Sequence, residues 1–482
     1  MFVEINFKSP SVEVKDQLKY DIFQEKVGIA FFDLRGLPVV VDVQEVLNCY
    51  TQQGVRALSN LCLGYACIIC DGHHQRVIFA SDNTGHTTFF YQVIGNRIQI
   101  SDSLSPLNLS CDAMIDRQSF QMYLECGFVP GERTIYKNIF KLPPGGYLTI
   151  EKGRIHRGNY SEIPRVIRRR VASLKEELKE SLVTSVARTL LKPTGVMLSG
   201  GFDSSFLCQI AQAYDKQVRT FTIGSWDYNP QTLDQGIRMA KILGTQHEVI
   251  EISIEEYLSS LPLTALAMDE PVLDLDTAFI YPALRRMPAK IEYLLHGVGS
   301  DQLIGNLFGQ MRKLVTSKAL TSSSVFGRYK AIANLDRRAG LFFIREKIPQ
   351  EVRLHYRLSS RKGARLIFPF LEPSMVRLAL QMPNILRKDK QLLRSLAPTL
   401  NKIFAVQMKS KVTGQIPGQL KDLTLKVYGN GIMQSRLLCD LVGKSRLSVI
   451  FSSRKKDEAL RLVVFSLWVK KNLRHQDHLS AA

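Results

Sequence analysis

The chain has 482 residues, of which 45% are hydrophobic and 22% charged, a composition typical of a folded protein with two or three domains. It contains no run of about 18 uncharged apolar residues and no basic-then-apolar signal at its N-terminus, so we expect a cytoplasmic protein that does not cross a membrane. The net charge of +20 favours anionic small ligands or an acidic peptide as partners. We do not expect nucleic acid, because no recognised nucleic-acid motif or aromatic-interleaved basic stripe accompanies the charge.

The first 160 residues are expected to form mainly β-structure. The apolar segments YACIICD, RVIFASD and RIQISDS are separated by turn residues such as Asp71-Gly72. Cys62, Cys67 and Cys70 have the C-x4-C-x2-C spacing of some metal sites. Because the surrounding segment resembles a buried strand, we interpret these cysteines as small apolar residues of a core.

The pattern changes after the Pro-Pro-Gly-Gly break at 143–146. Residues 173–191 have apolar positions at helical spacing, and from there strand-like and helix-like segments alternate up to about residue 299. This is the pattern of parallel α/β units, and the rest of the chain is mainly helical in character. We therefore predict an α/β protein with an α+β, β-rich N-terminal domain at 1–162 and a parallel-sheet domain with a helical extension at 163–482.

The segment GVMLSGGFDSS at 195–205 contains the clearest signs of a ligand-binding site. An apolar strand with both faces apolar ends at two glycines, and a helix begins directly afterwards. Amide groups and hydroxyls at a helix N-terminus form an anion site, and Asp203 within it implies a bridging divalent cation. The segment is not a Walker A loop, because it has no G-x4-G-K-[ST] pattern.

The S-G-G-x-D-S pattern resembles the pyrophosphate loop of the ATP pyrophosphatases, which adenylate a substrate and release pyrophosphate. Further segments resemble asparagine synthetases in the same order: FTIG at 221–224, DQGIRMAKILGTQH at 234–247, DEP at 269–271, GVGSD at 297–301, PFL at 369–371 and KQLLR at 390–394. The segments at 80–91 and 123–150 resemble the glutaminase domain of that family. The resemblance implies a glutaminase-like sandwich followed by a pyrophosphatase-type nucleotide-binding domain.

The resemblance also implies a set of site residues. ATP is expected to contact Leu198, Ser199, Gly200, Gly201, Asp203, Ser204, Ser205, Thr222, Ile223, Gly297 and Gly299. Asp203 and Asp301 are expected to hold Mg²⁺. Lys411 lies near the position of the family's late catalytic lysine; Lys409 is the other candidate, and a surface lysine is the alternative interpretation of Lys411.

Two departures from the family bear on which amine reacts with the adenylated substrate. Glutamine hydrolysis in that family uses a cysteine at position 2 with its own α-amine as base, whereas this chain has Phe2. We therefore expect an inactive glutaminase-like domain. Val298 occupies the position of an acid in asparagine synthetases and of a tyrosine in β-lactam synthetases. His296 is either the missing base or a structural histidine.

Further departures favour one subfamily. Arg365 and Ile367 replace the glutamate and arginine that precede P-F-L in asparagine synthetases, and Gln302 replaces a glutamate. These elements thus match the asparagine synthetase pattern only in part. Such partial matches resemble those of lasso-peptide cyclases, which close a macrolactam within a precursor peptide. The expected substrate is such a peptide or a small molecule with a carboxylate and an amine, and a leader peptidase and a leader-binding protein are the expected partners.

Three alternatives remain open from the sequence. The chain could be an asparagine synthetase-type enzyme that uses free ammonia, or a ligase like the β-lactam synthetases. It could also be an inactive ATP-binding scaffold, although the paired Asp203 and Asp301 argue against that role, because a structural binder has little need for two cation-holding carboxylates.

Overall fold

A computed structural model describes residues 1–6, 12–14, 22–24, 26–32, 42–61, 64–108, 114–161, 170–305, 329, 332, 335–361, 363–407, 418–452 and 456–472. The predicted domain boundary at 162 and 163 lies outside these residues, as do Cys62, Lys409 and Lys411.

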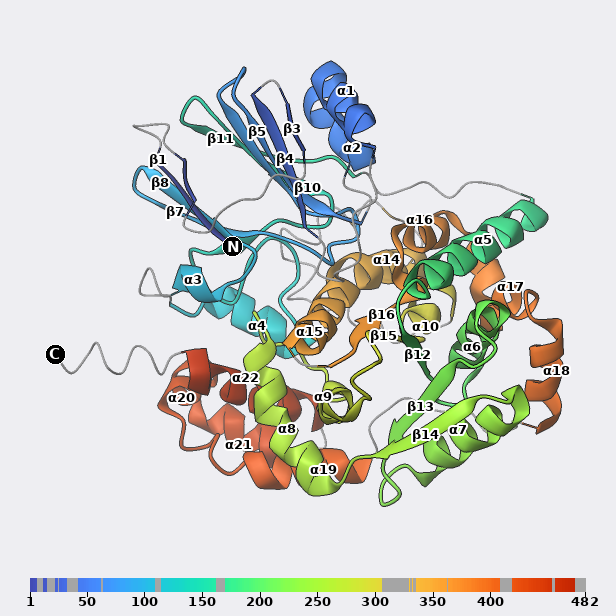
Figure 1. The fold of residues 1–482 in the computed structure, drawn as a ribbon. Coiled ribbons are helices and arrows are strands. Elements are labelled where there is room, and N and C mark those ends of the chain that lie inside the picture. The colour runs from blue at the N-terminus through green and yellow to red at the C-terminus, as the bar shows by residue number, and fades with distance from the viewer. Residues whose placement is uncertain are drawn as a thin grey trace.

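The N-terminal part is a sandwich of two antiparallel sheets, drawn in blue and cyan in Figure 1. The first sheet has the order β2-β1-β8-β7-β9, and the second has the order β11-β10-β6-β5-β4-β3. Their bounds are β1 Phe2–Asn6, β2 Val12–Val14, β3 Ile22–Gln24, β4 Val27–Phe32, β5 Ala66–Asp71, β6 Arg76–Ala80, β7 Phe90–Ile94, β8 Arg97–Ser101, β9 Phe140–Lys141, β10 Gly146–Glu151 and β11 Arg154–Asn159. The predicted β-rich architecture is confirmed.

Strand β5 places two of the cysteines on opposite faces of its sheet. Successive side chains of a strand point to opposite faces, so residues three apart cannot share a face. Cys67 packs with Ile69 and Tyr50 beneath helix α1 (Val43–Gln53), whereas Cys70 packs in the core between the two sheets. Cys67 and Cys70 are therefore apolar core residues on opposite sides of one sheet, as the apolar segment predicted.

The C-terminal part contains a five-stranded sheet in the order β14-β13-β12-β15-β16, and every neighbouring pair is parallel. Its bounds are β12 Thr194–Met197, β13 Arg219–Gly224, β14 Gln246–Glu251, β15 Tyr293–Leu295 and β16 Arg365–Ile367. The helices that accompany it include α5 Val171–Thr189, α6 Phe202–Tyr214, α7 Pro230–Leu243, α8 Ile254–Ala267, α9 Thr277–Arg286 and α10 Ser300–Ile304. The predicted parallel α/β fold is confirmed.

The order of these strands contains a switch point. The chain runs outward from β12 to β13 and β14, and then returns to place β15 on the other side of β12. In open parallel sheets, the carboxyl ends of the two strands at such a reversal form a crevice that binds ligands. The loops that follow β12 and β15 are the GVMLSGGFDSS and GVGSD segments, so the fold brings both to this crevice.

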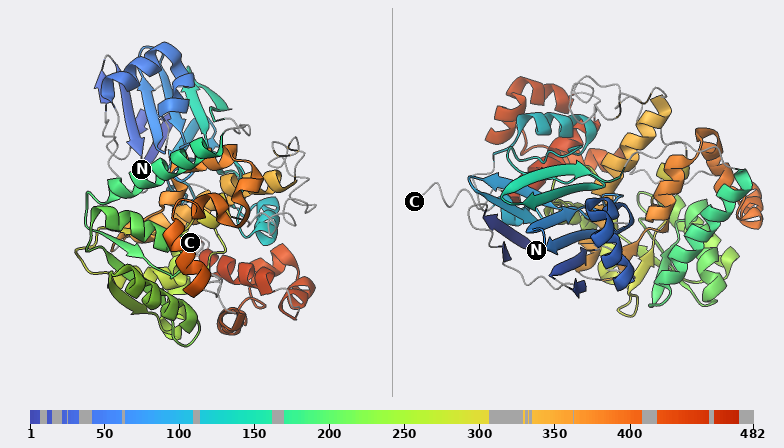
Figure 2. Two further views of the ribbon diagram at one scale, coloured as in Figure 1. Left: turned by 90° about the vertical axis from the view of Figure 1, so that its right-hand side faces the viewer. Right: turned by 90° about the horizontal axis from the view of Figure 1, so that it is seen from above.

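Further helices of the C-terminal part pack around the sheet and against the sandwich (Figure 2). They are α14 Leu335–Phe342, α15 Ile348–Arg361, α16 Pro373–Gln381, α17 Gln391–Arg394, α18 Pro398–Gln407, α19 Gly418–Tyr428, α20 Arg436–Val442, α21 Lys444–Ser452 and α22 Lys456–Asn472. Helix α22 is buried through Trp468, which lies against Tyr136 of the N-terminal part. None of the described helices is both long and apolar enough to span a bilayer.

One continuous helical segment joins the two parts of the molecule. It consists of α14, a π-helical turn η3 (Phe343–Lys347) and α15. Its side chains donate to backbone oxygens of N-terminal loops: Arg345 to Pro144, Gln350 to Val129, Arg353 to Gly85 and Arg357 to Asp102. Charged donors make strong hydrogen bonds, so this segment fixes the sandwich against the parallel-sheet domain.

Candidate functional site

The loop after β12 is shaped by its own hydroxyl groups. Ser199 Oγ lies 3.1 Å from Ser204 Oγ and accepts from the amide of Gly201. Ser205 Oγ donates to the Gly201 carbonyl at 2.7 Å, and no side chain caps the start of α6 among the described residues. The first amides of a helix have no intrahelical acceptor, so this uncapped end is available to an anion.

Two glycines make this tight turn possible. Gly200 has a φ of +75°, and a Cβ at that position would lie 2.5 Å from the Gln235 carbonyl carbon of α7. Gly236 of α7 approaches equally closely, because a Cβ there would lie 2.1 Å from Thr222 Oγ1. The helix can therefore lie directly against the loop and the end of β13, where Thr222 donates to the Leu198 carbonyl.

The loop after β15 lies beside the first loop. Because β12 pairs with both β13 and β15, the expected contacts at Thr222, Ile223, Gly297 and Gly299 all lie at adjacent strand ends. A Cβ at Gly297 would lie 3.4 Å from the Ser204 amide nitrogen, and Gly299 has a φ of +100° with Leu371 packed against it. The segments predicted to bind ATP are thus brought together at the crevice.

Lys390 connects the two loops. Its Nζ lies 2.5 Å from Asp203 Oδ2 and 2.6 Å from Asp301 Oδ1. Lys390 belongs to the K-x-x-L-R element, and Arg394 of the same element lies over the Phe202 ring at 4.9 Å. The sequence identified this element but gave Lys390 no role. Its position became clear only when residues 203, 301 and 390 were placed in space.

In this cluster, burial and the neighbouring charges shift the pKa values in opposite directions. Burial raises the pKa of Asp203, while the Lys390 ammonium partly offsets that effect. Burial also disfavours the charged form of Lys390, but the two carboxylates outweigh it and raise the pKa of that amine. The other oxygen of Asp203, Oδ1, is buried and makes no hydrogen bond of good geometry with a described residue, although the nearby Ser300 hydroxyl helps to lower the pKa of Asp203.

These groups fit a magnesium ion that is shared with a nucleotide. Mg²⁺ is commonly held by one or two carboxylates together with substrate phosphates. Asp203 and Asp301 provide such a pair, and the buried Asp203 Oδ1 is available to the ion. Over the described residues, no group of three or more His, Cys, Asp or Glu side chains is arranged to hold a metal ion, so phosphate oxygens would have to complete the coordination.

The D-E-P element does not contribute to this cluster. Asp269 pairs with Arg357 at 2.7 Å, and Glu270 pairs with Lys141 of β9 at 2.5 Å. The Glu270 pair spans the two parts of the molecule, and Asp269 also accepts from the Ser103 hydroxyl and the Leu104 amide of the N-terminal part. The element therefore fixes the relative position of the two parts, a role that local sequence could not indicate.

His296 makes a structural contact at the end of β15. Its Nδ1 accepts the Val298 amide at 3.0 Å, which supports the turn after β15. Burial, together with the charge of His355, lowers the pKa of His296 to about 3. A ring with so low a pKa accepts protons poorly, which favours the structural interpretation of this histidine.

Comparison with known proteins agrees with this geometry. Residues 177–402 match the family model described as asparagine synthase, and residues 40–161 match the model of a glutamine amidotransferase domain. Over these two regions the chain is similar to the asparagine synthase family. The two matched regions correspond to the parallel-sheet domain and to most of the sandwich.

Similar curated proteins include asparagine synthetase [glutamine-hydrolyzing] 1 of Bacillus subtilis, which is 26% identical over 55% of this chain and 43% of the relative. Asparagine synthetase B of Escherichia coli is 24% identical over 55% of this chain and 47% of the relative. A putative asparagine synthetase of Methanocaldococcus jannaschii is 25% identical over 55% of this chain and 53% of the relative. The chain therefore spans about half the length of these relatives.

Among solved structures, a glutamine phosphoribosylpyrophosphate amidotransferase from B. subtilis is similar over 48% of this chain and 63% of its own, at 12% identity and a TM-score of 0.20.

Proposed function

We propose that this chain is an ATP-dependent carbon–nitrogen ligase that joins a carboxylate to an amine and releases AMP and pyrophosphate. The observation that carries the proposal is the approach of Asp203 and Asp301 to one ammonium group from two loops at the switch point. The homologous asparagine synthetases supply the reaction class, and the loop geometry supports its transfer to this chain.

The reaction has two steps. An oxygen of the substrate carboxylate attacks the α-phosphorus of ATP, the bond to the bridging oxygen breaks, and pyrophosphate leaves with the electron pair. The amine then attacks the acyl-adenylate, the bond between the acyl carbon and the AMP oxygen breaks, and the nitrogen loses a proton. The product is an amide.

The chain's own residues hold the leaving group in this proposal. The amides at the start of α6 and the hydroxyls of Ser199 and Ser204 bind the pyrophosphate, because they form an uncapped helix terminus. Lys390 adds a positive charge beside it. A magnesium ion on Asp203 and Asp301 would neutralise charge on the phosphates. Lys411, or Lys409, is proposed to stabilise the charge on the α-phosphate.

The amine is proposed to come from a source other than glutamine. A glutaminase needs a thiolate nucleophile. Among the described cysteines of the N-terminal part, Cys67 and Cys126 are buried, whereas Cys49 and Cys70 are half-buried. Burial raises the pKa of Cys126 to about 12. Phe2 lies in β1 opposite Ser101 of β8 and packs against the hydrophobic core.

We further propose that the amine and the carboxylate belong to one substrate, a lasso-type precursor peptide that the enzyme closes into a macrolactam. Val298, Arg365 and Gln302 support this choice, because they depart from the asparagine synthetase pattern in the way that lasso-peptide cyclases do. Holding both groups in one site lowers the entropic cost of joining them. A leader peptidase and a leader-binding protein are the partners proposed for this pathway.

The reaction class is tested with the purified chain, ATP, Mg²⁺ and a peptide that has a free N-terminus and an internal Asp or Glu. AMP and pyrophosphate are expected, whereas ADP and phosphate would contradict the proposal. Asp203→Asn is expected to lower the rate by about 10²–10³-fold. Asp215→Asn, at the far end of α6, is the matched control and is expected to leave the rate unchanged.

The substrate is tested separately by mass spectrometry. Intramolecular closure gives a peptide that is lighter by one water, and acetylation of its N-terminus should abolish the product. Asparagine formed from aspartate, ATP and ammonium would instead favour the asparagine synthetase-type reaction. Full pathway function retained by Asp203→Asn would favour an inactive scaffold.

A further inference from the structure

Strand β11 is an edge strand of the second sheet of the sandwich. It pairs with β10 on one side, and no described strand pairs with its other side. Pairs in an antiparallel ladder alternate between hydrogen-bonded and non-hydrogen-bonded, and Tyr160 N donates to the paired Gly145 carbonyl at 2.9 Å. The backbone groups of Ile155, Arg157 and Asn159 therefore face away from β10. They form an open edge to which an extended peptide can pair.

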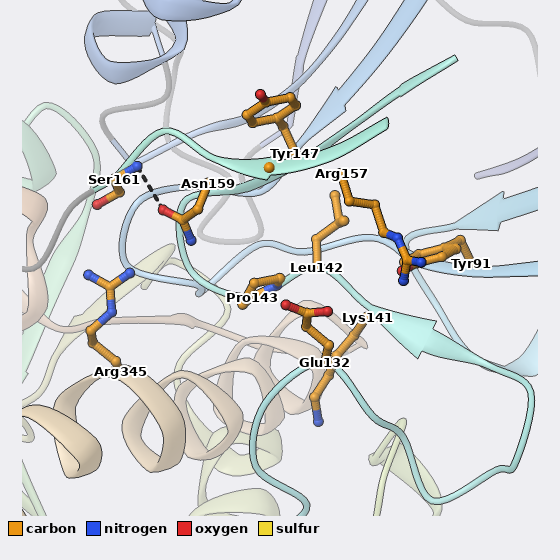
Figure 3. A pocket seen from close by; sticks show the side chains of 11 residues that line it. Tyr91, Glu132, Lys141, Leu142, Pro143, Tyr147, Arg157, Asn159, Ser161 and Arg345 are labelled. Atoms are coloured by element: carbon orange, nitrogen blue, oxygen red, sulfur yellow. Dashed lines mark hydrogen bonds between the residues drawn. The ribbon is translucent and has the colours of Figure 1, made fainter. Parts of the chain in front are cut away.

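A cavity of about 450 Å³ adjoins this edge (Figure 3). Its walls come from β7, β9, β10 and β11 and from the π-helical turn η3. This volume lies within the range of ligand-binding sites. None of the described lining residues belongs to the loops at 199–205 or 297–301, so the cavity is separate from the proposed ATP site.

Arg157 of β11 points into this cavity from the open edge. Ile155 packs in the core between the two sheets, and alternate side chains of a strand share a face, so Arg157 lies on the same face. Its Nη1 donates to Tyr91 Oη of β7 at 3.2 Å, and it makes no ion pair with a described carboxylate. A strand added beside β11 would also direct every second side chain to this face.

Arg345 supplies a second guanidinium group at the opposite end of the cavity (Figure 3). Its Nη2 donates to the Pro144 carbonyl at 2.9 Å, and Asn159 Nδ2 donates to the same oxygen at 3.2 Å, so Arg345 lies beside the end of β11. Arg345 is only 6% exposed and makes no ion pair with a described carboxylate. A buried charge without a counterion is costly, and a carboxylate from a ligand would remove that cost.

The backbone at Arg345 keeps the adjacent carboxylate away from it. The turn Phe343–Lys347 is π-helical, and such turns are frequent at functional sites. Arg345 lines the cavity, while Glu346 accepts the Gly131 amide at 2.8 Å and the Tyr329 hydroxyl at 2.7 Å. The turn therefore separates two neighbouring opposite charges.

The charge balance of the cavity favours an acidic ligand. The Lys141 ammonium is paired with Glu270 at 2.5 Å. Glu132 is the one carboxylate among the described lining residues, against the two guanidinium groups of Arg157 and Arg345. The chain as a whole carries a net charge of +20, which acts in the same direction.

We propose that β11 and this cavity bind an extended acidic peptide. The peptide pairs with the open edge of β11 as an added strand, and two of its carboxylates face the cavity, one beside Arg157 and the other beside Arg345. One carboxylate cannot reach both guanidinium groups, because they lie at opposite ends of the cavity (Figure 3). Two acidic residues four positions apart share a face of a strand and are separated by about 13 Å, which suits this arrangement.

The test measures binding to the full chain by fluorescence anisotropy, without ATP. The probe is a labelled nine-residue threonine peptide with glutamates at its third and seventh positions. The control peptides have glutamates at the third and sixth positions, glutamines in place of both glutamates, or a methyl group on every backbone amide nitrogen. Each control is expected to bind roughly tenfold more weakly, because it loses a carboxylate from the cavity or the pairing with β11.

Two arginine variants locate the site. Arg345→Gln should weaken binding of the probe roughly tenfold. Arg157→Gln lies on the exposed edge, where folding is not at stake, and should weaken binding several-fold. Arg154→Gln is the matched control, because Arg154 is an exposed arginine on the opposite face of the same strand.

Asp203→Asn should bind the probe normally, so this result is independent of the proposed ligase reaction. The proposal is overturned if the probe does not bind at millimolar concentration or if neither arginine variant weakens binding. It is equally overturned if the peptide with glutamates three positions apart, or the methylated peptide, binds as tightly as the probe.

Discussion

Lys390 Nζ lies 2.5 Å from Asp203 Oδ2, across 187 positions of the sequence. The same ammonium lies 2.6 Å from Asp301, so one cation holds together the two loops at the switch point. Lys390 and Asp203 are largely buried, with side chains 15% and 16% exposed, whereas the Asp301 side chain is 56% exposed. The strongest part of the cluster is therefore the contact between Lys390 and Asp203, and Asp301 is the more accessible carboxylate.

Replacing Lys390 should make the site dependent on a divalent cation. Lys390→Met leaves two carboxylates facing one another without their shared cation, and we expect a loss of about 2 kcal/mol in the free energy of unfolding when EDTA is present. Mg²⁺ should restore much of this loss, since binding to the folded state alone stabilises it. Thermal unfolding with EDTA and with Mg²⁺ measures both effects.

The matched control for this experiment is Lys402→Met on the exposed side of α18, which should respond to neither condition. If Mg²⁺ raises the melting temperature of Lys390→Met no more than that of the unmodified chain, the two carboxylates do not form a cation site.

The crowding around Gly200 gives a second prediction. Gly200 and Gly244 both have positive φ values, +75° and +66°, but a Cβ at Gly244 would meet nothing within 4 Å. Gly244→Ala should therefore lower the free energy of unfolding only by the cost of placing an alanine in a left-handed backbone conformation, about 1–2 kcal/mol. Gly200→Ala should cost more and also abolish AMP formation, because its Cβ collides with the backbone of Gln235 in α7. Urea unfolding compares the two variants, and equal losses would contradict this explanation.

The sequence predicted the parallel sheet and its loops well, because their signals are local. The apolar run before Gly200 identifies a buried central strand, and two glycines followed by Asp203 mark a ligand-binding turn. The two loops carrying Asp203 and Asp301 could be expected to meet once the alternating pattern implied a parallel sheet.

Other features could not be predicted, because they depend on distant partners. Strand β16 has three residues, Arg365–Ile367, too few for a recognisable period. The charges of Arg345 and Glu346 resemble those of an ordinary helix surface, yet both side chains are buried by loops more than 200 positions earlier. Lys390 likewise acquires its role only from carboxylates on two other loops.

The buried ion pair between Lys141 and Glu270 gives a third prediction. The side chains are 5% and 3% exposed, and burial lowers the pKa of Lys141 and raises that of Glu270. Lys141→Met should destabilise the protein by about 3–5 kcal/mol, since it leaves a buried carboxylate without its partner. The double variant Lys141→Met with Glu270→Leu should recover most of this loss.

Urea unfolding of the two single variants and the double variant measures the coupling between these residues. Lys421, in an exposed pair with Asp457, provides the control, and Lys421→Met should cost less than about 1 kcal/mol. A double variant no more stable than Lys141→Met would mean that the pair itself, rather than the burial of an unpaired charge, stabilises the interface.

A group of charges around Asp276 gives a prediction about pH. His355 Nε2 lies 3.2 Å from Asp274 Oδ2, and the Asp276 amide donates to Asp274 Oδ1 at 3.1 Å. Loss of hydration, followed by the charge of Asp274, raises the pKa of Asp276 to about 7, although His355 and Lys347 act in the opposite direction and Glu351 adds to the rise. The Asp276 side chain nevertheless reaches solvent, so screening reduces the effect on stability.

Asp276 should therefore make the protein less stable as the pH rises. Between pH 4 and pH 7, the folded chain keeps the Asp276 proton that the unfolded chain loses near pH 3.8, so the free energy of unfolding falls with increasing pH. Asp276→Asn has no such proton to lose. Its stability relative to the unmodified chain should rise over this range and level off above pH 7. Asp215→Asn, which changes an exposed carboxylate at the end of α6, should produce no such trend. Urea unfolding at intervals from pH 4 to pH 8 makes the comparison. If the stability difference between Asp276→Asn and the unmodified chain stays constant across the series, the Asp276 carboxylate ionises alike in the folded and unfolded states.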